Sequence, residues 1–218
     1  MSGHAGLPEA EALAALADFG SATVYEAQGA KGALDSGIKP IDAGMRIAGR
    51  AVTVDVRPAD NLMLHYALLH AKPGDVLVVD AKGFLEAGPW GDVLTEQAKH
   101  QGLAGLVING AVRDARAIIE MGFPVFCRGL SIKGTGKNQP GKLNVPVCIG
   151  DVVIHPGDVI IGDMDGVVVV RPDELDEVVL KSHAREEKEA QFRAGIRAGA
   201  NTAQLLGLEE TLQRLNIR

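Results

Sequence analysis

The sequence predicts an α/β fold in which helices cover a largely parallel sheet. Three continuous apolar runs, at residues 76–80, 106–109 and 125–128, alternate with segments of helical periodicity. Strands buried on both faces of a parallel sheet have this character. Val, Ile, Leu and Ala must build the core, because the chain has only one Trp, two Tyr and five Phe. Its 218 residues suffice for one sizeable domain.

The first half of the chain alternates between helical and strand patterns. Gly20 separates an amphipathic helix from a second helix that starts at Ser21. Valines at every second position from Val52 to Val56 indicate a strand. The stretch 81–90 is rich in glycine, and Gly110 is expected to end the strand before it. The expected helices are 7–19, 21–27, 61–71, 91–101 and 114–121, and the expected strands are 51–56, 76–80, 106–109 and 125–128.

The second half begins with the longest irregular stretch, residues 131–144, a kind of loop that often carries function. Short strands separated by Pro-Gly-Asp and Asp-Gly turns follow, and they predict an antiparallel module. Two helices close the chain. We therefore expect a single domain over residues 1–218, with N-terminal helices at about 7–30 and C-terminal helices at about 172–218. The expected strands are 145–149, 152–155, 159–161 and 166–170, and the helices are 172–192 and 201–215.

Charge and hydropathy exclude several classes of protein. The formal net charge of −6 argues against nucleic acid as a partner. No apolar run reaches the roughly 18 residues of a membrane span, and the first residues do not resemble a signal peptide. Cys127 and Cys148 lie in apolar runs without metal-ligand spacing, which favours buried, reduced thiols. The expectation is a cytoplasmic protein that contacts neither membrane nor nucleic acid.

The segment Gly91-Asp92-Val93-Leu94 approaches the start of a predicted helix. The first backbone N–H groups of a helix have no partner within it, and the helix dipole favours an anion there. The amides of Asp92, Val93 and Leu94 are therefore candidates for binding a carboxylate. Many helices begin after a glycine, so an ordinary helix start remains an alternative.

Arg113 and Asp114 follow a buried strand and precede a helix. Strand ends that lead into helices form the usual ligand-binding edge of α/β sheets. Arg113 offers a planar, permanent charge for a carboxylate or enolate oxygen, and Asp114 offers a hard oxygen ligand for Mg²⁺ or Mn²⁺. The alternative is that Asp114 caps the helix while Arg113 is its surface partner.

These residues carry a resemblance to a known family. The run Gly91 to Leu94, the block 105–114 and the tail 156–170, with its Asp-Met-Asp-Gly turn, resemble the 4-hydroxy-4-methyl-2-oxoglutarate / 4-carboxy-4-hydroxy-2-oxoadipate aldolases. Their superfamily also includes the regulator of ribonuclease E activity A. The resemblance covers nearly the whole chain. It implies a swivelling β/β/α domain with flanking helices, assembled as a homotrimer or homohexamer, and a class II aldolase that releases pyruvate with a divalent metal.

The resemblance also implies roles for individual residues. Asp114 matches the metal-binding aspartate, and Arg113 matches the arginine that binds substrate and stabilises the enolate. Gly91, Val93 and Leu94 match the pyruvate-binding segment, in which Asp92 lies near the water shell of the metal. The family adds a metal-binding glutamate from a neighbouring subunit. Glu189 is the best match for it, with Glu186 and Glu187 within one turn.

Two other functions remain open at this point. The resemblance also allows a non-catalytic regulator of an RNA-processing enzyme, or an enzyme that is primarily an oxaloacetate decarboxylase. The long terminal helices and the acids at 186–189 favour the aldolase branch. None of the lysines lies in an apolar strand, where burial would lower its pKa and suit it to a Schiff base. The sequence does not identify the base that takes the C4 hydroxyl proton.

Other polar residues have simpler interpretations. Asp163, Asp165 and Gly166 predict a tight hairpin turn rather than a metal site. His65 and His70 are expected at the surface or at the edge of the core. Lys133 and Lys137, in the long loop, are candidates for binding a distal carboxylate of the substrate. These candidates all follow from their positions in the sequence.

Overall fold

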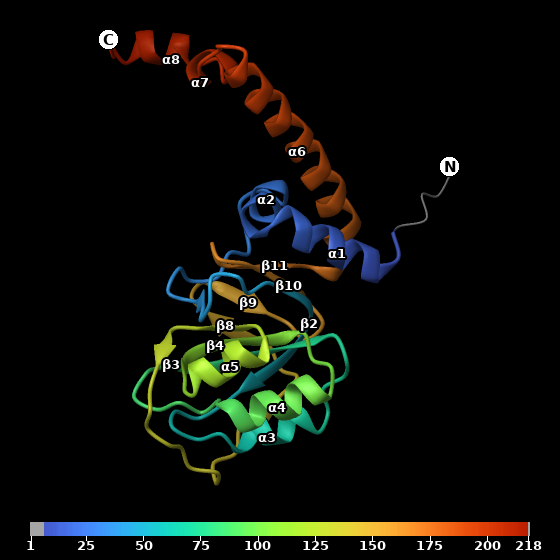
Figure 1. The fold of residues 1–218 in the computed structure, drawn as a ribbon, viewed down its shortest axis with the longest axis vertical. Helices are drawn as coiled ribbons and strands as arrows, with labels where there is room; N and C mark the ends of the chain where they lie inside the picture. Colours follow the sequence, from blue (N-terminus) through green and yellow to red (C-terminus); the bar gives the residue numbers. More distant parts are fainter. Residues whose placement is uncertain (1–6, 218) are drawn as a thin grey trace.

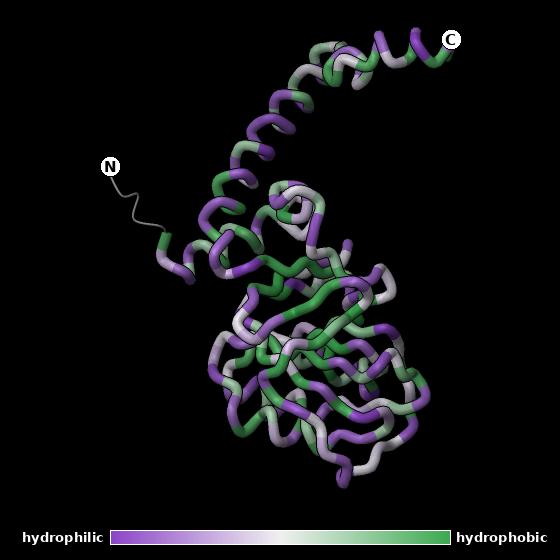
Figure 2. Tube along the Cα trace, turned by 180° about the vertical axis from the view of Figure 1, so that it is seen from behind, coloured by the Kyte–Doolittle hydropathy of each residue, from purple (hydrophilic) through white to green (hydrophobic). Residues whose placement is uncertain are grey.

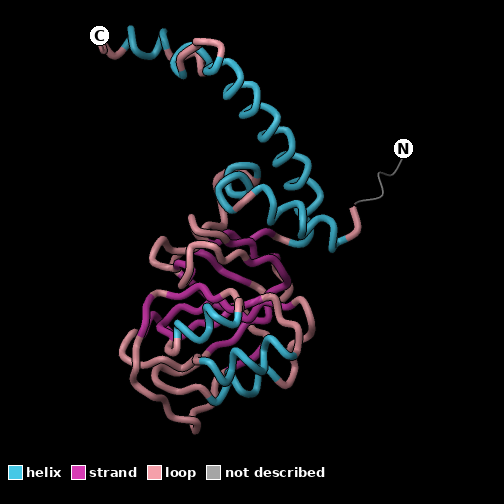
Figure 3. The backbone as a smooth tube through the Cα atoms, viewed as in Figure 1, coloured by secondary structure: helices cyan, strands magenta, loops and turns pink. Residues whose placement is uncertain are grey.

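A computed structural model describes residues 7–217 and contains a mixed sheet of nine strands with flanking helices (Figures 1 and 3). The α/β class with terminal helices is confirmed. Residues 1–6 and 218 of the expected domain lie outside the described part. The main path through the sheet is β1-β5-β4-β3-β2-β10-β11, and β6 and β7 pair beside it with β4 and β2. The strands are β1 (Lys39–Pro40), β2 (Ile47–Asp55), β3 (Asp75–Phe84), β4 (Gly105–Val112), β5 (Val125–Cys127), β6 (Gly129–Leu130), β7 (Lys142–Leu143), β8 (Val147–Ile149), β9 (Val152–Ile154), β10 (Val159–Gly162) and β11 (Val167–Val170).

The centre of the sheet consists of the parallel strands β2, β3, β4 and β5. The side chains of β4 and β5 and most of those of β3 are buried on both faces, as the continuous apolar runs predict, whereas those of β2 alternate between buried and half-buried. On one face, Leu77 and Val79 pack under α3 (Leu62–Leu68), α4 (Asp92–His100) and α5 (Ala115–Met121), which cover this face in Figure 1. The adjacent residues, Val76 and Val78, belong to a second core cluster on the other face.

The antiparallel strands divide between two sheets, which corrects the expected separate module. Strands β8 and β9 form a hairpin of their own, and its apolar residues join the second core cluster. Strand β10 instead pairs with β2, so β10 and β11 extend the main sheet. Helices α1 (Glu9–Phe19), α2 (Ser21–Ala27) and α6 (Leu175–Arg197) pack against these two strands. Between β10 and β11, Asp163 and Asp165 lie in the predicted hairpin turn.

Two strands are longer than predicted because of a bulge. Lys82 and Gly83 both have positive φ, of 61° and 67°, and the pairing of β3 with β4 resumes beyond them at Phe84 and Gly110. A Cβ at Gly110 would lie 2.9 Å from that of Ala81. Gly110 therefore permits a close approach between strands and does not end β4, which continues to the residue before Arg113.

The C-terminal helices project from the body (Figure 1). A 3₁₀ turn, η1 (Pro172–Glu174), leads into α6, which extends five residues beyond its expected end at Phe192. The expected helix at 201–215 is divided into α7 (Thr202–Leu205) and α8 (Glu209–Arg214), with Gly207 at a φ of 64° between them. Figure 2 shows a largely hydrophilic projection with apolar positions interspersed. None of the helices within residues 7–217 combines the length and apolar character that a membrane crossing requires.

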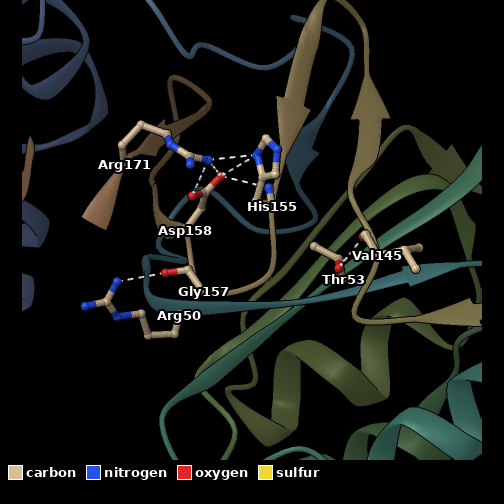
Figure 4. Close-up of polar contacts among 7 residues, drawn as sticks. All are labelled: Arg50, Thr53, Val145, His155, Gly157, Asp158 and Arg171. Carbon is tan, nitrogen blue, oxygen red and sulfur yellow. Dashed lines mark hydrogen bonds and ion pairs between the residues drawn. The ribbon is translucent and has the colours of Figure 1, made fainter. Parts of the chain in front are cut away.

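A buried charge fixes the base of this projection to the sheet (Figure 4). The Asp158 side chain is only 1% exposed and accepts hydrogen bonds from Arg171 Nη1 at 2.7 and 2.9 Å and from the His155 N–H at 2.8 Å. Arg171 Nη1 also lies 2.7 Å from His155 Nδ1. Because Arg171 immediately precedes η1, the cluster joins the β9–β10 turn to the start of the C-terminal helices.

Candidate functional site

Asp114 has an unusual backbone conformation at the end of β4. Its φ and ψ are 58° and 32°, in the left-handed region that non-glycine residues seldom adopt. It occupies the N-cap position of α5, yet its side chain makes no capping hydrogen bond, so the interpretation as a simple cap is wrong. Its Oδ2 instead lies 3.3 Å from both the Asp92 N–H and Arg113 Nε. The strain therefore accompanies a carboxylate turned toward α4.

Gly91 lies directly before α4 and is enclosed by the same two side chains. A Cβ at Gly91 would lie 2.4 Å from Asp114 Oδ2 and 3.0 Å from Arg113 Nε. A side chain at this position therefore cannot coexist with the observed arrangement. Asp92 Oδ1 accepts a hydrogen bond of 2.8 Å from the Val93 N–H, so a ligand at this amide must displace the carboxylate.

Trp90 and Thr95 fix the position of this helix start. Both are fully buried, and Trp90 Nε1 donates to Thr95 Oγ1 at 2.7 Å. The Thr95 hydroxyl donates to the Gly91 carbonyl at 2.9 Å, while the Trp90 carbonyl accepts from the Arg113 N–H at 2.9 Å. Trp90 thus helps to position both the amides at the start of α4 and Arg113. Sequence reasoning did not identify this role, because it depends on contacts rather than on a motif.

A pocket of about 190 Å³ lies beside Arg113 and the start of α4. The long loop contributes Lys137, because the loop is attached to the start of α3. Asp60, which is only 2% exposed, accepts hydrogen bonds from the amides of Asn138 and Gln139 at 2.9 and 3.2 Å. Lys133 does not line this pocket and forms a 2.5 Å ion pair with Glu86. The lining residues are Asn61, His65, Pro89, Gly91, Asp92, Val93, Leu94, Arg113 and Lys137.

His65 lines the pocket, where we expected only a surface or core-edge residue. Burial, followed by the nearby positive charge of Lys137, lowers the pKa of His65 below its usual 6.5. Asn61 lies one helical turn earlier and is 7% exposed. The i, i+4 spacing of Asn61 and His65 was the available sequence signal, since it places both on one helix face.

Glu189 does not meet the other candidate residues within one chain. It lies on α6, which projects from the opposite end of the molecule to α4 and α5 (Figure 1), and it pairs with Arg185 and Arg193 at 3.0 and 3.2 Å. Within residues 7–217, moreover, no three His, Cys, Asp or Glu side chains are grouped so that they could hold a metal. One chain thus places Asp114, Asp92 and Arg113 together and leaves Glu189 apart.

Comparisons with known proteins place this chain in a family. The model of the RraA-like family (Aldolase/RraA) matches residues 14–169. A protein of Halalkalibacterium halodurans, provisionally named as a 4-hydroxy-4-methyl-2-oxoglutarate aldolase, is 43% identical over 162 residues, which cover 74% of this chain and 77% of that protein.

Solved structures agree with the match to the family model. An uncharacterized protein from Pseudomonas syringae pv. tomato has a TM-score of 0.80 at 29% identity and covers 93% of this chain and 99% of its own. The RNA-processing inhibitor RraA from Thermus thermophilis has a TM-score of 0.60 at 30% identity, over 63% of this chain and 84% of its own. The chain therefore belongs to the RraA-like family of aldolases and RraA proteins.

Proposed function

We propose that this protein is a class II, divalent-metal-dependent aldolase that cleaves a 4-hydroxy-2-oxo di- or tricarboxylate and releases pyruvate. The observation that carries the proposal is the packing of Arg113 and Asp114 against the start of α4. A guanidinium, a carboxylate and helix amides on one wall suit a 2-oxo acid. The relative provisionally named as an aldolase supports the same reaction class. The substrates we propose are 4-carboxy-4-hydroxy-2-oxoadipate and 4-hydroxy-4-methyl-2-oxoglutarate.

The pyruvate half of the substrate would bind between α4 and Arg113. Once the Asp92 carboxylate leaves the Val93 N–H, the amides at the start of α4 would donate hydrogen bonds to the substrate carboxylate, which the helix dipole also favours. Arg113 stabilises the negative charge that develops on the 2-keto oxygen as the enolate forms. Lys137, which lines the same pocket, supplies positive charge for a further carboxylate of the substrate. A net charge of −6 makes these local cations necessary for binding an anion.

The residues present fit Mg²⁺ or Mn²⁺. These ions are commonly bound by one or two carboxylates, with water and substrate oxygens as the remaining ligands. Asp114 Oδ2 lies 3.3 Å from the backbone N–H of Asp92, and Asp92 lines the pocket. Asp114 would hold the ion, and Asp92 would contact its water shell. Once bound, the ion supplies Lewis-acid chemistry to the 2-keto acid.

A second subunit would complete the site. Glu189 lies on α6, which projects away from Asp114 of the same chain. A second subunit is therefore needed to bring Glu189 and Asp114 together. The proposal is therefore a homotrimer or homohexamer in which Glu189 of one chain approaches Asp114 of another. Glu186 and Glu187, within one turn, are alternatives to Glu189 for this role.

Two further activities are related to the proposed one. Oxaloacetate decarboxylation forms the same pyruvate enolate, so we propose it as a slower secondary reaction. The similarity to the RNA-processing inhibitor RraA favours a non-catalytic regulator as the second candidate function. A regulator would have no need for a carboxylate turned toward helix amides at the edge of a pocket.

Measurement of pyruvate release from 4-carboxy-4-hydroxy-2-oxoadipate tests the proposal. We expect release by the wild-type chain with Mg²⁺ and none by a folded Asp114→Asn variant. Asp173→Asn, which changes an exposed acid outside the lining residues, is the matched control and should retain activity. No pyruvate release by the wild type with either Mg²⁺ or Mn²⁺ would favour the regulator instead.

A further inference from the structure

Two residues that line the pocket each have a buried polar atom without a hydrogen-bond partner in the described part of the chain. Asn61 Nδ2 donates to the Pro89 carbonyl at 2.9 Å, which fixes the amide, while its Oδ1 has no partner within residues 7–217. His65 Nε2 is likewise buried and unpaired in that part of the chain. A buried polar atom without a partner costs about 1–3 kcal/mol. Both residues line the pocket that contains Arg113.

The chemistry of these two atoms indicates what they would bind. An amide oxygen only accepts hydrogen bonds, so Asn61 Oδ1 requires a donor and cannot pair with a carboxylate. A 4-hydroxy-2-oxo acid carries one such donor beyond its pyruvate unit, the C4 hydroxyl. Of the two atoms, only the imidazole nitrogen is basic enough to remove a proton. Burial and Lys137 lower the pKa of His65, which keeps the ring neutral and able to accept.

We propose that His65 Nε2 is the base that takes the C4 hydroxyl proton during cleavage, and that Asn61 Oδ1 orients this hydroxyl. The inference rests on the proposed function. As the proton moves to Nε2, C4–O becomes a carbonyl and the C3–C4 bond breaks. The electron pair of that bond passes to the pyruvate enolate, whose oxygen faces Arg113. His65 then releases its proton to solvent, and C3 takes up one proton to give pyruvate.

A comparison of two reactions at the same site separates this role from simple support of the fold. Retro-aldol cleavage requires a base for the hydroxyl, whereas oxaloacetate already carries a carboxylate and requires none. We expect His65→Gln to lower kcat for cleavage on the order of 100-fold, as is typical of general-base removal, with decarboxylation within about twofold of wild type. His70→Gln changes an exposed residue just beyond the end of α3 that does not line the pocket, and it should leave both rates unchanged.

The outcomes distinguish this inference from the proposed function. A wild-type chain that cleaves no 4-hydroxy-2-oxo acid refutes both. If the wild type cleaves, an equal loss of both reactions in folded His65→Gln refutes the role of His65 alone, as does unchanged cleavage. Circular dichroism checks the fold of the variant. If His65→Gln unfolds, His65→Phe replaces it, because phenylalanine keeps a planar ring without a basic nitrogen. An equal loss of both reactions, or unchanged cleavage, in this variant would likewise refute the role of His65.

Discussion

At the scale of single residues, the site depends on a strained aspartate and a glycine that fit together. A non-glycine residue in the left-handed region costs on the order of 1–3 kcal/mol, which the rest of the fold must offset. At Asp114 this conformation turns the carboxylate toward α4. Gly91 has ordinary extended dihedrals, so the space occupied by Asp114 and Arg113, rather than φ, requires glycine there.

Gly91→Ala tests this fit. The added methyl group would lie 2.4 Å from Asp114 Oδ2, so the carboxylate and Arg113 must both move. A misplacement of about 1 Å costs on the order of 100-fold in rate, and we expect a loss of that size in kcat/KM while the fold is retained. Gly134→Ala is the control, because its Cβ would lie 4.0 Å from Arg113 Nη1, an ordinary contact. Equal activity of the two variants would show that Asp114 has no fixed position.

At the scale of elements, the sequence predicts those whose periodicity is long and regular. The central strands and the helices at 92–100 and 115–121 lie close to their expected positions. Gly110 was misjudged because a glycine that ends a strand and one that allows strands to approach look alike in sequence. His65 was underestimated because a pocket forms only when α3, α4 and the 131–144 loop come together. Tertiary contacts decide both cases, and local pattern contains little of that information.

The Asp158 cluster makes a prediction about the base of the C-terminal projection. Arg171→Met would leave the Asp158 carboxylate, 1% exposed, without its cation. Arg171 itself is 45% exposed, so only the carboxylate of this pair is buried. Leaving a buried hydrogen-bond acceptor unsatisfied costs about 1–3 kcal/mol, and we expect a loss of this size in the free energy of unfolding. Arg116→Met, which breaks an exposed pair with Glu120, should cost less than about 1 kcal/mol. Urea denaturation measures both, and similar losses would show that the Asp158 pair contributes no more than a surface contact.

At the scale of the whole molecule, the projecting helices have apolar residues that nothing in the described chain covers. Ile196, Leu206 and Leu215 are 46%, 53% and 57% exposed. Covering such side chains with a second subunit would remove apolar area from water. This pattern fits the proposed oligomer, in which the same projection delivers Glu189 to a neighbouring site.

Mixed oligomers test whether the sites are shared. Asp114→Ala and Glu189→Ala chains, each inactive alone, should regain activity when unfolded and refolded together, because some sites then receive Asp114 and Glu189 from intact chains. Asp114→Ala mixed with Arg113→Ala is the control, since we place both residues on the same side of the interface. Demonstrated hybrids without recovered activity would contradict the shared site.

The most direct measurement distinguishes metal-dependent cleavage from cleavage through a lysine Schiff base. A Schiff-base lysine needs a lowered pKa. Burial alone would lower the pKa of Lys82, but hydrogen bonds to Asp55 and Asp80 outweigh it and raise this pKa, and Lys133 is paired with Glu86. We therefore predict that EDTA stops pyruvate release, that Mg²⁺ or Mn²⁺ restores it, and that borohydride with pyruvate leaves activity intact. Covalent trapping of pyruvate on a lysine, with release unaffected by EDTA, would contradict the account.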